Sequence, residues 1–327
     1  MNERKCKVYV TRLLPGPALD MLRASCDVEV NPHDDAISHD ELIEKVKGRD
    51  GVVTLLTDKV DAEVIKAGAQ GVPPLRVIAN YAVGYDNVDV ACATEHSIFV
   101  SNTPGVLTNT TADIAWALML SIARRIPEAE RFARAGKFKG WSPTLFLGGD
   151  IYGKTLGIVG VGRIGAAVAM RTPGFKMRVL YNDVRHNYEI EKAVGAEKVD
   201  MDTLLKESDF ISVHVPLMPE TRHLIGKRSL SMMKPTAYLI NTSRGPVIDE
   251  AALAEALKNK VIAGAALDVF EEEPKIHPGL LELDNVIVVP HIASGSVETR
   301  SKMAIMAAEN VLAVLSGKTP PNAVNRI

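Results

Sequence analysis

The sequence predicts an α/β protein with two domains, each built on a doubly wound parallel sheet. Three observations lead to this fold class. Short runs rich in Val, Ile, Leu and Ala recur along all 327 residues, and several are continuously apolar, as parallel strands buried on both faces are. Helical patterns separate these runs, which is the order of βαβ units. The length allows two domains, each with its own core.

The candidate strands fall into two successive series. The first series comprises residues 7–10, 27–30, 51–55, 76–79 and 98–100, and the second comprises residues 155–159, 178–181, 210–213, 237–240, 264–268 and 286–289. Helical patterns such as residues 200–207 and 250–258 connect members of the second series. Each series therefore predicts one parallel sheet with helices on both faces.

The segment between the two series contains the predicted domain boundary. Thr103-Pro104-Gly105 predicts a turn, and residues 108–125 predict a long helix with polar residues in its first turn. Its apolar positions form two faces, so it packs against a neighbouring domain or against a second subunit. The final helical pattern, residues 296–316, has no strand after it and is expected to pack back on the N-terminal array. We therefore expect one discontinuous domain of residues 1–100 and 293–327, with residues 101–292 inserted as the other.

Composition excludes several classes of protein. The formal net charge is −2, so no overall positive field attracts nucleic acid or anionic lipid. The three cysteines, Cys6, Cys26 and Cys92, are widely spaced without a Cys-x-x-Cys pair, so we expect neither a disulfide framework nor a metal site. The N-terminal sequence lacks the apolar core of a signal peptide, and no apolar run is long enough to span a membrane. These features predict a cytoplasmic protein with no nucleic-acid or membrane partner.

A glycine-rich loop follows the first strand of the second series. It reads Gly160-Val161-Gly162-Arg163-Ile164-Gly165, and a helix is expected over residues 166–171. In a dinucleotide-binding unit the first glycine permits a tight turn, the second lets the pyrophosphate approach the backbone, and the third lets helix and strand pack closely. The glycine motif alone has little specificity. Its position between a strand and a helix makes a Rossmann-type dinucleotide site the favoured interpretation.

An acidic residue ends the next predicted strand. Asp183 follows Gly165 at roughly the spacing of 20 residues that the ribose-binding carboxylate of such a unit shows. A carboxylate accepts hydrogen bonds from ribose hydroxyls and repels a 2′-phosphate, so Asp183 favours NAD. Arg185 and His186 lie close in sequence and could reduce that repulsion, so NADP is not excluded.

Three later loops offer a cation, a carboxylate and an imidazole. Arg244, Glu273 and His291 each follow a different predicted strand, and ligands of open α/β sheets bind at the carboxyl ends of strands. A guanidinium can bind a substrate carboxylate and polarise a carbonyl. An imidazole can give the carbonyl oxygen a proton, and a carboxylate can orient that imidazole. Singly, each of these residues has an ordinary structural explanation. Together, after a dinucleotide loop, they predict reversible hydride transfer to a 2-oxo acid.

At this point nearly the whole chain resembles the D-isomer-specific 2-hydroxyacid dehydrogenases. The resemblance rests on the runs GVGRIG, HVPLMPETRHLI, MKPTAYLINTSRGPVIDE, GAALDVFEEEP and VVPHIASGS. It implies a Rossmann NAD-binding domain inserted in a flavodoxin-like substrate domain. It also implies that Arg244 binds substrate, that His291 is the general acid and base, and that Glu273 is the partner of His291.

The resemblance assigns further residues to the two ligands. For the cofactor it implies Thr108, Gly160, Gly162, Arg163, Ile164, Gly165, Asp183, Val215, Pro216, Thr221, Thr242, Asp268 and Ser294, with Asp268 at the nicotinamide carboxamide. For the substrate it implies Leu55, Val83, Gly84, Arg244, His291 and Trp141. The backbone N–H groups of Val83 and Gly84 would bind the substrate carboxylate within the loop Asn80–Asn87, where a small glycine permits close approach.

The run Trp141-Ser142-Pro143-Thr144-Leu145-Phe146-Leu147-Gly148 is similar to the glyoxylate and hydroxypyruvate reductases of this family. In those enzymes the loop crosses a homodimer, and its Trp helps close the partner's active site. The resemblance thus implies reduction of glyoxylate or hydroxypyruvate to the D-2-hydroxy acid. An equal alternative is that Trp141 only packs at a subunit interface, where aromatic residues are favoured. Pro173 and Gly295-Ser296 depart from the usual family pattern. We expect Pro173 to shorten a helix by a turn, and Gly295-Ser296, near the predicted active site, to affect the substrate range.

Other functions compete with this interpretation. A dinucleotide-sensing regulator, similar to the C-terminal-binding corepressors, shares the fold but carries a disordered C-terminal extension that we do not expect after Ile327. Formate dehydrogenases have Gln where this chain has Glu273. Phosphoglycerate dehydrogenase is harder to separate, although we expect no regulatory domain after the catalytic core.

Overall fold

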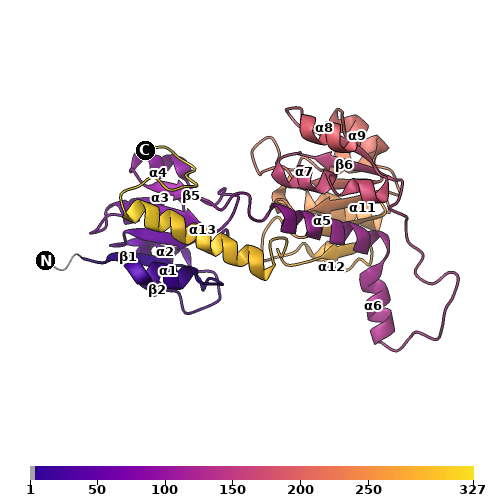
Figure 1. Cartoon of the computed structure of the whole chain (residues 1–327). Coiled ribbons are helices and arrows are strands. Elements are labelled where there is room, and N and C mark those ends of the chain that lie inside the picture. Colours follow the sequence, from indigo (N-terminus) through magenta and orange to yellow (C-terminus); the bar gives the residue numbers. More distant parts are fainter. Residues whose placement is uncertain (1–3) are drawn as a thin grey trace. The chain divides into compact units, whose positions relative to one another are not determined.

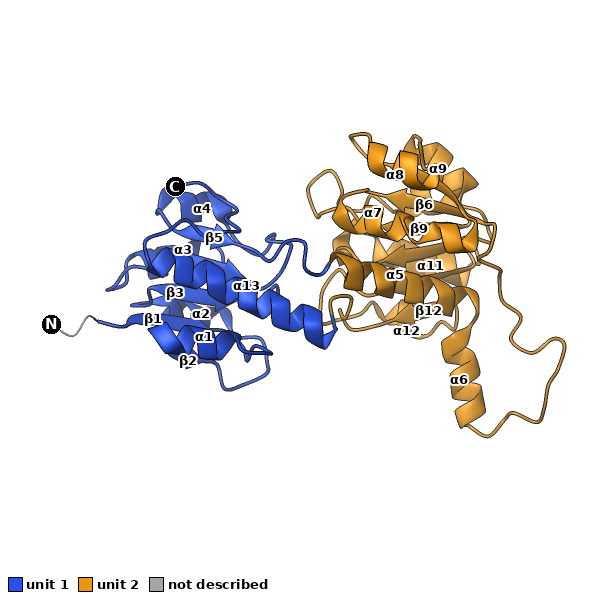
Figure 2. Cartoon of the chain, in the orientation of Figure 1, with its two compact units in different colours: residues 1–107, 295–327 blue, residues 108–294 orange. Residues whose placement is uncertain are grey.

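The computed structural model describes residues 4–327. The chain forms two compact units (Figure 2). Unit 1 runs to Leu107 and resumes at Gly295–Ile327, and unit 2 is Thr108–Ser294. The sequence alone places these boundaries after residue 100 and before residue 293. Which unit binds substrate and which binds the cofactor stays a prediction at this point.

Unit 1 is built on a five-stranded parallel sheet (Figure 1). Its strands are β1 (Cys6–Val10), β2 (Cys26–Val30), β3 (Gly51–Thr54), β4 (Val77–Asn80) and β5 (Phe99–Ser101). They are arranged in the order β2-β1-β3-β4-β5, and every pairing is parallel. This is the flavodoxin-like strand order, so the predicted fold class of this part of the chain is confirmed.

Helices cover both faces of this sheet. They are α1 (Ala18–Ser25), α2 (His39–Val46), α3 (Ala62–Ala69), α4 (Val90–Glu95) and α13 (Val297–Leu315). The C-terminal helix α13 packs against α1 and against strands β3 and β4. On the other face, Leu42 of α2 and Ile65 of α3 join Val52 and Ile78 of the sheet in one core. The expected return of the last helix to the N-terminal array is therefore observed.

Unit 2 is built on a seven-stranded parallel sheet. Its strands are β6 (Thr155–Val159), β7 (Arg178–Asn182), β8 (Glu197–Lys198), β9 (Phe210–Val213), β10 (Tyr238–Asn241), β11 (Gly264–Leu267) and β12 (Val286–Val288). The order is β12-β11-β10-β9-β6-β7-β8. Counted from β6, this is the Rossmann order with one further strand. Strands β6 and β9 span the predicted residues, and the other predicted strands shift by a residue or two. The pattern of apolar runs does not reveal β8, which has two polar residues.

The helices of unit 2 are α5 (Thr108–Ala123), α6 (Ile126–Arg134), α7 (Arg163–Ala169), α8 (Tyr188–Val194), α9 (Met201–Glu207), α10 (Lys227–Met232), α11 (Glu250–Lys258) and α12 (Pro278–Leu281). One core joins Trp116 and Met119 of α5 to the sheet, and the other joins Leu204 of α9 and Leu257 of α11 to it. Helix α7 begins earlier than expected, at Arg163 rather than at residue 166, because the extended backbone of Gly162 already caps it. Pro173 lies in a short 3₁₀ turn after α7.

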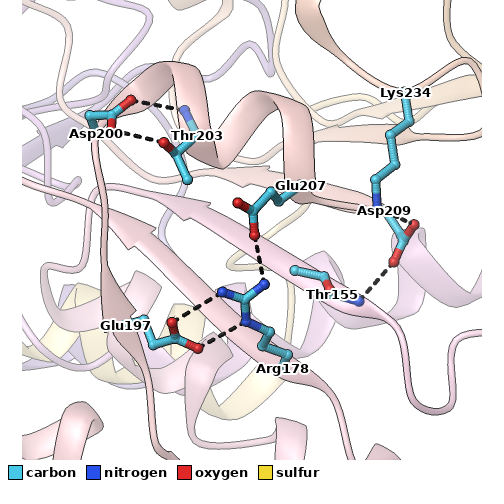
Figure 3. Close-up of polar contacts among 8 residues, drawn as sticks. All are labelled: Thr155, Arg178, Glu197, Asp200, Thr203, Glu207, Asp209 and Lys234. Carbon is cyan, nitrogen blue, oxygen red and sulfur yellow. Dashed lines mark hydrogen bonds and ion pairs between the residues drawn. The ribbon is translucent and has the colours of Figure 1, made fainter.

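Charged residues link the amino-terminal ends of the strands in the second sheet (Figure 3). Arg178 begins β7 and donates to Glu197 on β8 and to Glu207 on α9. Asp209, just before β9, accepts from the Thr155 N–H at 2.9 Å and from Lys234 Nζ at 2.9 Å. These contacts link strands and a helix at the edge opposite to the carboxyl ends, so they stabilise the sheet away from the site where its ligands are expected.

A long extension leaves unit 2 after α5. We call residues 126–150, which comprise α6 and the irregular segment that returns to β6, the arm (Figure 1). Helix α6 has no buried residue. Phe138, Trp141 and Leu147 of the arm are 60%, 85% and 66% exposed. These three exposed apolar side chains lie close together in the sequence, and exposed apolar patches commonly mark interaction surfaces.

Residues 4–327 lack two kinds of feature. No helix there has the length and apolar character needed to cross a membrane. No group of three or more His, Cys, Asp and Glu side chains there is arranged to hold a metal ion.

Candidate active site at the carboxyl ends of the second sheet

The strand order of unit 2 reverses between β6 and β9, which are neighbours in the sheet. Their following loops touch, since a Cβ placed on Gly160 would lie 2.7 Å from Val215 Cγ1 and 3.0 Å from the His214 carbonyl carbon. Open α/β sheets bind ligands at such a switch point, outside the carboxyl ends of the strands. The glycine loop and the run His214-Val215-Pro216 thus meet where a dinucleotide is expected.

The glycine loop leaves its backbone accessible. Gly160 adopts a left-handed φ of +88°, and a Cβ on Gly165 would collide with the Gly160 carbonyl oxygen at 2.1 Å. A side chain at Gly165 would therefore push α7 away from β6, and a side chain at Gly160 would push against the loop after β9. A Cβ on Gly162, in contrast, would meet no atom within 4 Å. Gly162 is the residue at which a pyrophosphate is expected to approach the backbone, and Arg163 and Ile164 follow it in the first turn of α7.

Asp183, just after β7, is fixed against the glycine loop. Its Oδ2 accepts the Val161 N–H at 2.8 Å, and its Oδ1 accepts the Arg185 N–H at 3.3 Å. Asn187 Nδ2 donates to the Val161 carbonyl at 3.0 Å. The carboxylate therefore lies beside the loop predicted to bind phosphate. This is the placement that a ribose-binding group requires.

The loops after β9 and β10 contribute four further predicted cofactor residues, Val215, Pro216, Thr221 and Thr242. Thr221 Oγ1 donates to the Pro216 carbonyl at 2.7 Å and accepts the Met218 N–H at 2.8 Å, which closes the loop that holds Val215 and Pro216. Thr242 is 7% exposed, and its Oγ1 is buried without a hydrogen-bond partner among residues 4–327. A buried hydroxyl without a partner calls for water or a ligand. These residues fit a bound dinucleotide.

His291 and Glu273 form a hydrogen-bonded pair. His291 Nδ1 lies 2.8 Å from Glu273 Oε2, and Glu273 Oε1 accepts the Phe270 N–H at 3.1 Å. Burial alone would raise the pKa of Glu273. The hydrogen bond and charge of His291, the Phe270 N–H and the positive charge of Arg244 outweigh burial and hold it below its ordinary value. An ionised Glu273 leaves Nε2 of His291 as the ring nitrogen available for proton transfer.

Asp268 holds the loop that carries His291. Its carboxylate accepts the N–H groups of Ile292 at 2.6 Å and Ala293 at 2.9 Å, and its carbonyl oxygen accepts the His291 N–H at 2.9 Å. His291 has a left-handed φ of +51°, a strained conformation for a residue with a side chain. Burial raises the pKa of Asp268 despite these two N–H bonds and the charge of His291. Its role at the nicotinamide carboxamide stays a prediction, because both carboxylate oxygens already bind the backbone here.

Arg244 follows β10 in the same unit. Its Nη1 donates to the Ser243 carbonyl oxygen at 2.9 Å, and Asn241 Nδ2 donates to the Arg244 carbonyl at 3.0 Å. The positive charge of Arg244 is among the causes that lower the pKa of Glu273. The structure thus brings Arg244, Glu273 and His291 together from the ends of three strands.

The predicted substrate residues of the N-terminal part lie in unit 1, at the carboxyl ends of β3 and β4. Asn87 Nδ2 donates to the Leu55 carbonyl at 3.0 Å, and Asn80 Nδ2 donates to the Gly84 carbonyl at 2.9 Å. The carbonyls of Ala82 and Val83 accept from Thr103 N–H and Asn102 Nδ2. Because C=O and N–H point in opposite directions across a trans peptide, the N–H groups of Val83 and Gly84 face away from those partners.

Three predicted residues remain to be placed: Thr108, Ser294 and Trp141. Thr108 is the first residue of α5, and Ser294 is the last residue of unit 2. Trp141 lies on the arm. Sequence reasoning missed two features: the support that Asp268 gives to the His291 loop, and His214, whose Nε2 lies 2.8 Å from Ser212 Oγ. Burial lowers the pKa of His214 to about 4. The spacing between Asp268 and His291 gave no signal for the first, since the contact joins two loops.

Comparison with known proteins establishes the family. Residues 116–293 match the model of the D-isomer specific 2-hydroxyacid dehydrogenase, NAD binding domain. A glyoxylate reductase from Korarchaeum cryptofilum is 53% identical over 98% of this chain and 96% of its own. The chain therefore belongs to the D-isomer-specific 2-hydroxyacid dehydrogenases, and unit 2 contains their NAD-binding domain.

Two solved structures have the same fold over nearly the whole chain. The TT0316 protein from Thermus thermophilus is 44% identical, with a TM-score of 0.90 over 98% of this chain and 100% of that one. An NADPH-dependent glyoxylate/hydroxypyruvate reductase from Sinorhizobium meliloti, in complex with NADP and malonate, is 32% identical, with a TM-score of 0.85 over 98% and 97% of the two chains. The family description names NAD and this relative is NADPH-dependent, so these comparisons do not select one form of the cofactor for this chain.

Proposed function

We propose that this dehydrogenase reduces glyoxylate or hydroxypyruvate to glycolate or D-glycerate, reversibly and with NADH as the preferred cofactor. The observation that carries the proposal is the His291–Glu273 pair, 2.8 Å apart, on the sheet edge that also holds Arg244. The identity of about half of all residues with a glyoxylate reductase over nearly the whole chain supports the choice of substrate.

The residues divide the chemistry among themselves. NADH, when bound, supplies a hydride to the C2 carbon of the 2-oxo acid. His291 gives a proton to the carbonyl oxygen, and the ionised Glu273 favours the protonated imidazole before that transfer. Arg244 binds the substrate carboxylate and polarises the carbonyl, a task suited to a planar guanidinium. The resemblance to the family also assigns the N–H groups of Val83 and Gly84 to the binding of a substrate carboxylate, and Leu55 to packing over the small substrate.

The cofactor preference rests on Asp183. Its carboxylate accepts one N–H from the glycine loop at 2.8 Å and retains lone pairs for ribose hydroxyls. A 2′-phosphate next to this negative charge would be repelled, whereas Arg185, two residues further on, offers a weaker opposite charge because it is exposed. Asp268, Thr242 and the loop from Val215 to Thr221 would contact the remainder of the dinucleotide.

The arm supports a homodimer. Its exposed apolar side chains, Trp141 among them, would be covered by a second copy of the chain. Within this proposal Trp141 reaches the partner's active site and narrows the substrate range. We also propose a cytoplasmic location, in keeping with three free cysteines in the described part of the chain.

The decisive experiment is a panel of 2-oxo acids, each assayed with NADH and with NADPH. The panel contains glyoxylate, hydroxypyruvate, its 3-phosphate, pyruvate and a bulky branched 2-oxo acid. We expect the highest kcat/KM for glyoxylate or hydroxypyruvate with NADH. Preference for the phosphorylated substrate would favour a phosphoglycerate dehydrogenase. Tight NADH binding without turnover of any 2-oxo acid would favour the dinucleotide-sensing regulator.

The arm is tested by sedimentation of the wild type and of Trp141→Ala. A wild-type dimer is expected, and the variant should change relative kcat/KM among the 2-oxo acids. A monomeric wild type would refute the dimer, and an unchanged substrate profile would leave Trp141 as an interface residue only.

A further inference from the structure

Two glutamates outside the predicted site accept each other's backbone N–H. Glu250 begins α11, and its Oε1 accepts the Glu271 N–H at 2.6 Å. Glu271 follows β11, and its Oε2 accepts the Glu250 N–H at 3.0 Å. This reciprocal pair joins the start of a helix to a loop that follows a different strand. Neither side chain forms part of the substrate or cofactor site described above.

The pair clamps the loop that carries Glu273. Glu250 Oε2 also accepts the His277 N–H at 3.2 Å, so one carboxylate holds both ends of the segment from Glu271 to His277. Glu273 lies between these two anchor points. Glu250 is only 5% exposed, and burial raises its pKa, with its two N–H bonds offsetting part of that effect. Charge-assisted bonds shielded from water are among the stronger contacts in a protein.

The other oxygen of Glu271 is also occupied. His223 Nε2 lies 2.6 Å from Glu271 Oε1, and Arg222 Nη2 lies 3.9 Å from the same atom. The Glu271 side chain is 20% exposed. The clamp therefore includes a third segment, the loop after β9 that also contains the predicted cofactor residue Thr221.

A close backbone contact connects this clamp to Arg244. A Cβ placed on Gly245 would lie 1.9 Å from both the carbonyl carbon and the oxygen of Phe270. Only a glycine allows this approach. The residue after Arg244 thus lies directly against the residue whose N–H binds Glu273. The loop after β10, which carries Arg244, and the loop after β11, which carries Glu273, are thus in contact at Gly245. The Glu250–Glu271 pair joins the same two regions at a second point.

We propose that Glu250 and Glu271 are positioning residues that set the orientation of Glu273 toward His291. The inference rests on the proposed roles of Glu273 and His291 in proton transfer. In metal sites, residues that orient a ligand typically change affinity or activity by about 10- to 100-fold when altered, and we expect an effect of the same order here. A Gln at position 250 keeps the size of the side chain, but its amide nitrogen would face an N–H donor, so one of the two bonds is lost.

The first test compares the kinetics of Glu250→Gln with those of Glu255→Gln. Glu255 lies on the same helix with a side chain 61% exposed and 3.9 Å from Lys227, so it is the matched control. We expect kcat for 2-oxo acid reduction to fall about 10-fold or more in Glu250→Gln, with KM for NADH nearly unchanged. We also expect the alkaline limb of the pH–rate profile to move to lower pH, because a displaced Glu273 favours the protonated imidazole less. Glu255→Gln should match the wild type.

The second test does not depend on turnover. The ring protons of His291, identified by their loss in His291→Asn, are titrated by NMR in the wild type, in Glu250→Gln and in Glu273→Gln. The pH midpoint of the His291 titration in Glu250→Gln should lie between the midpoints in the wild type and in Glu273→Gln. If the wild type reduces no 2-oxo acid but this shift occurs, the proposed function fails and the positioning inference holds.

Glu271→Gln gives the same test at a more exposed position should Glu250→Gln fold poorly. Activity that falls only in proportion to folded protein, with an unmoved pH profile and an unmoved His291 midpoint, would overturn the inference.

Discussion

In unit 2 the imidazole of His291 and the carboxylate of Glu273 share a 2.8 Å hydrogen bond, although the two residues follow different strands. Glu273 comes after β11 and His291 after β12, and these strands are neighbours at the edge of the sheet. Their loops therefore leave the sheet side by side. The backbone conformation of His291 is strained. Asp268 accepts backbone N–H groups of the same loop, and these hydrogen bonds stabilise that conformation and hold the ring within reach of Glu273.

This pair predicts unequal effects for its two members. His291→Asn removes the proton donor, so kcat for reduction should fall by about 10²- to 10⁴-fold. Glu273→Gln keeps the ring in place with a neutral partner and should cost less. NADH binding, measured by fluorescence titration, should be nearly unchanged in both. A His291→Asn enzyme with near-normal kcat would rule out His291 as the general acid.

Replacing Arg244 is expected to weaken the binding of the substrate in the transition state. Arg244→Ala should lower kcat/KM for the 2-oxo acid by about 10²- to 10³-fold, the range seen when one donor to a developing oxyanion is lost. Arg244→Lys should recover only part of this loss, because an ammonium cannot bind a carboxylate through two parallel N–H groups. Steady-state kinetics with both variants checks this. Full recovery by lysine would mean that charge alone is needed at this position.

Asp183 predicts a change in cofactor preference. Asp183→Ser should lower kcat/KM for NADH by about 10- to 100-fold, since it removes hydrogen bonds to a charged acceptor. It should raise the rate with NADPH relative to that with NADH.

Asp183→Asn separates two contributions of this residue, because Asn keeps an acceptor for the Val161 N–H but loses the charge. A normal NADH rate in Asp183→Asn with an increased NADPH rate would assign the preference to charge. If the ratio of kcat/KM with NADH to kcat/KM with NADPH were the same in the wild type and in both variants, Asp183 would not select the cofactor.

Because His214 is buried, we expect the stability of the folded protein to fall at acidic pH. Burial lowers its folded pKa to about 4 from an ordinary value of 6.5. The unfolded chain therefore binds a proton in that window while the folded protein does not, so stability is lost as pH falls from 6.5 toward 4. Between pH 7 and pH 4.5, His214→Gln should lose less free energy of unfolding than the wild type, by on the order of 2 kcal/mol.

Urea denaturation at several pH values measures this difference. His33→Gln is the control because His33 is exposed in unit 1, and it should follow the wild type. Parallel curves for the wild type and His214→Gln would contradict the prediction.

Local pattern was sufficient for much of the fold. The apolar run that forms β6, the glycines after it and Asp183 at the end of β7 are all readable from a stretch of some thirty residues, because a βαβ unit uses neighbouring sequence. Strand β8 was not readable, since Glu197–Lys198 is short, polar and paired on one side only. The full order of the seven strands also depends on how distant connections pack, which no local pattern contains.

The candidate site likewise contains residues that could be predicted from the sequence and residues that could not. Arg244, Glu273 and His291 could be selected because each residue type has a required task in hydride transfer to a 2-oxo acid. Their supports could not be selected in this way. Asp268 and Glu250 act by accepting backbone N–H groups from loops far along the chain, and a backbone donor has no residue type to recognise in a sequence.

The return of the chain to unit 1 has a consequence for the order in which the protein is made. Helix α13 supplies Val311 and Val314 to the sheet face of unit 1, and Val324 and Asn325 bind the backbone of Val100 on β5. A ribosome synthesises these residues after those of unit 2. Residues 4–107 therefore emerge with part of one sheet face and one strand edge uncovered, whereas Thr108–Ser294 is continuous and can fold as soon as it has emerged. The stretch of unit 1 that precedes unit 2 in the chain is completed only after unit 2 has been made.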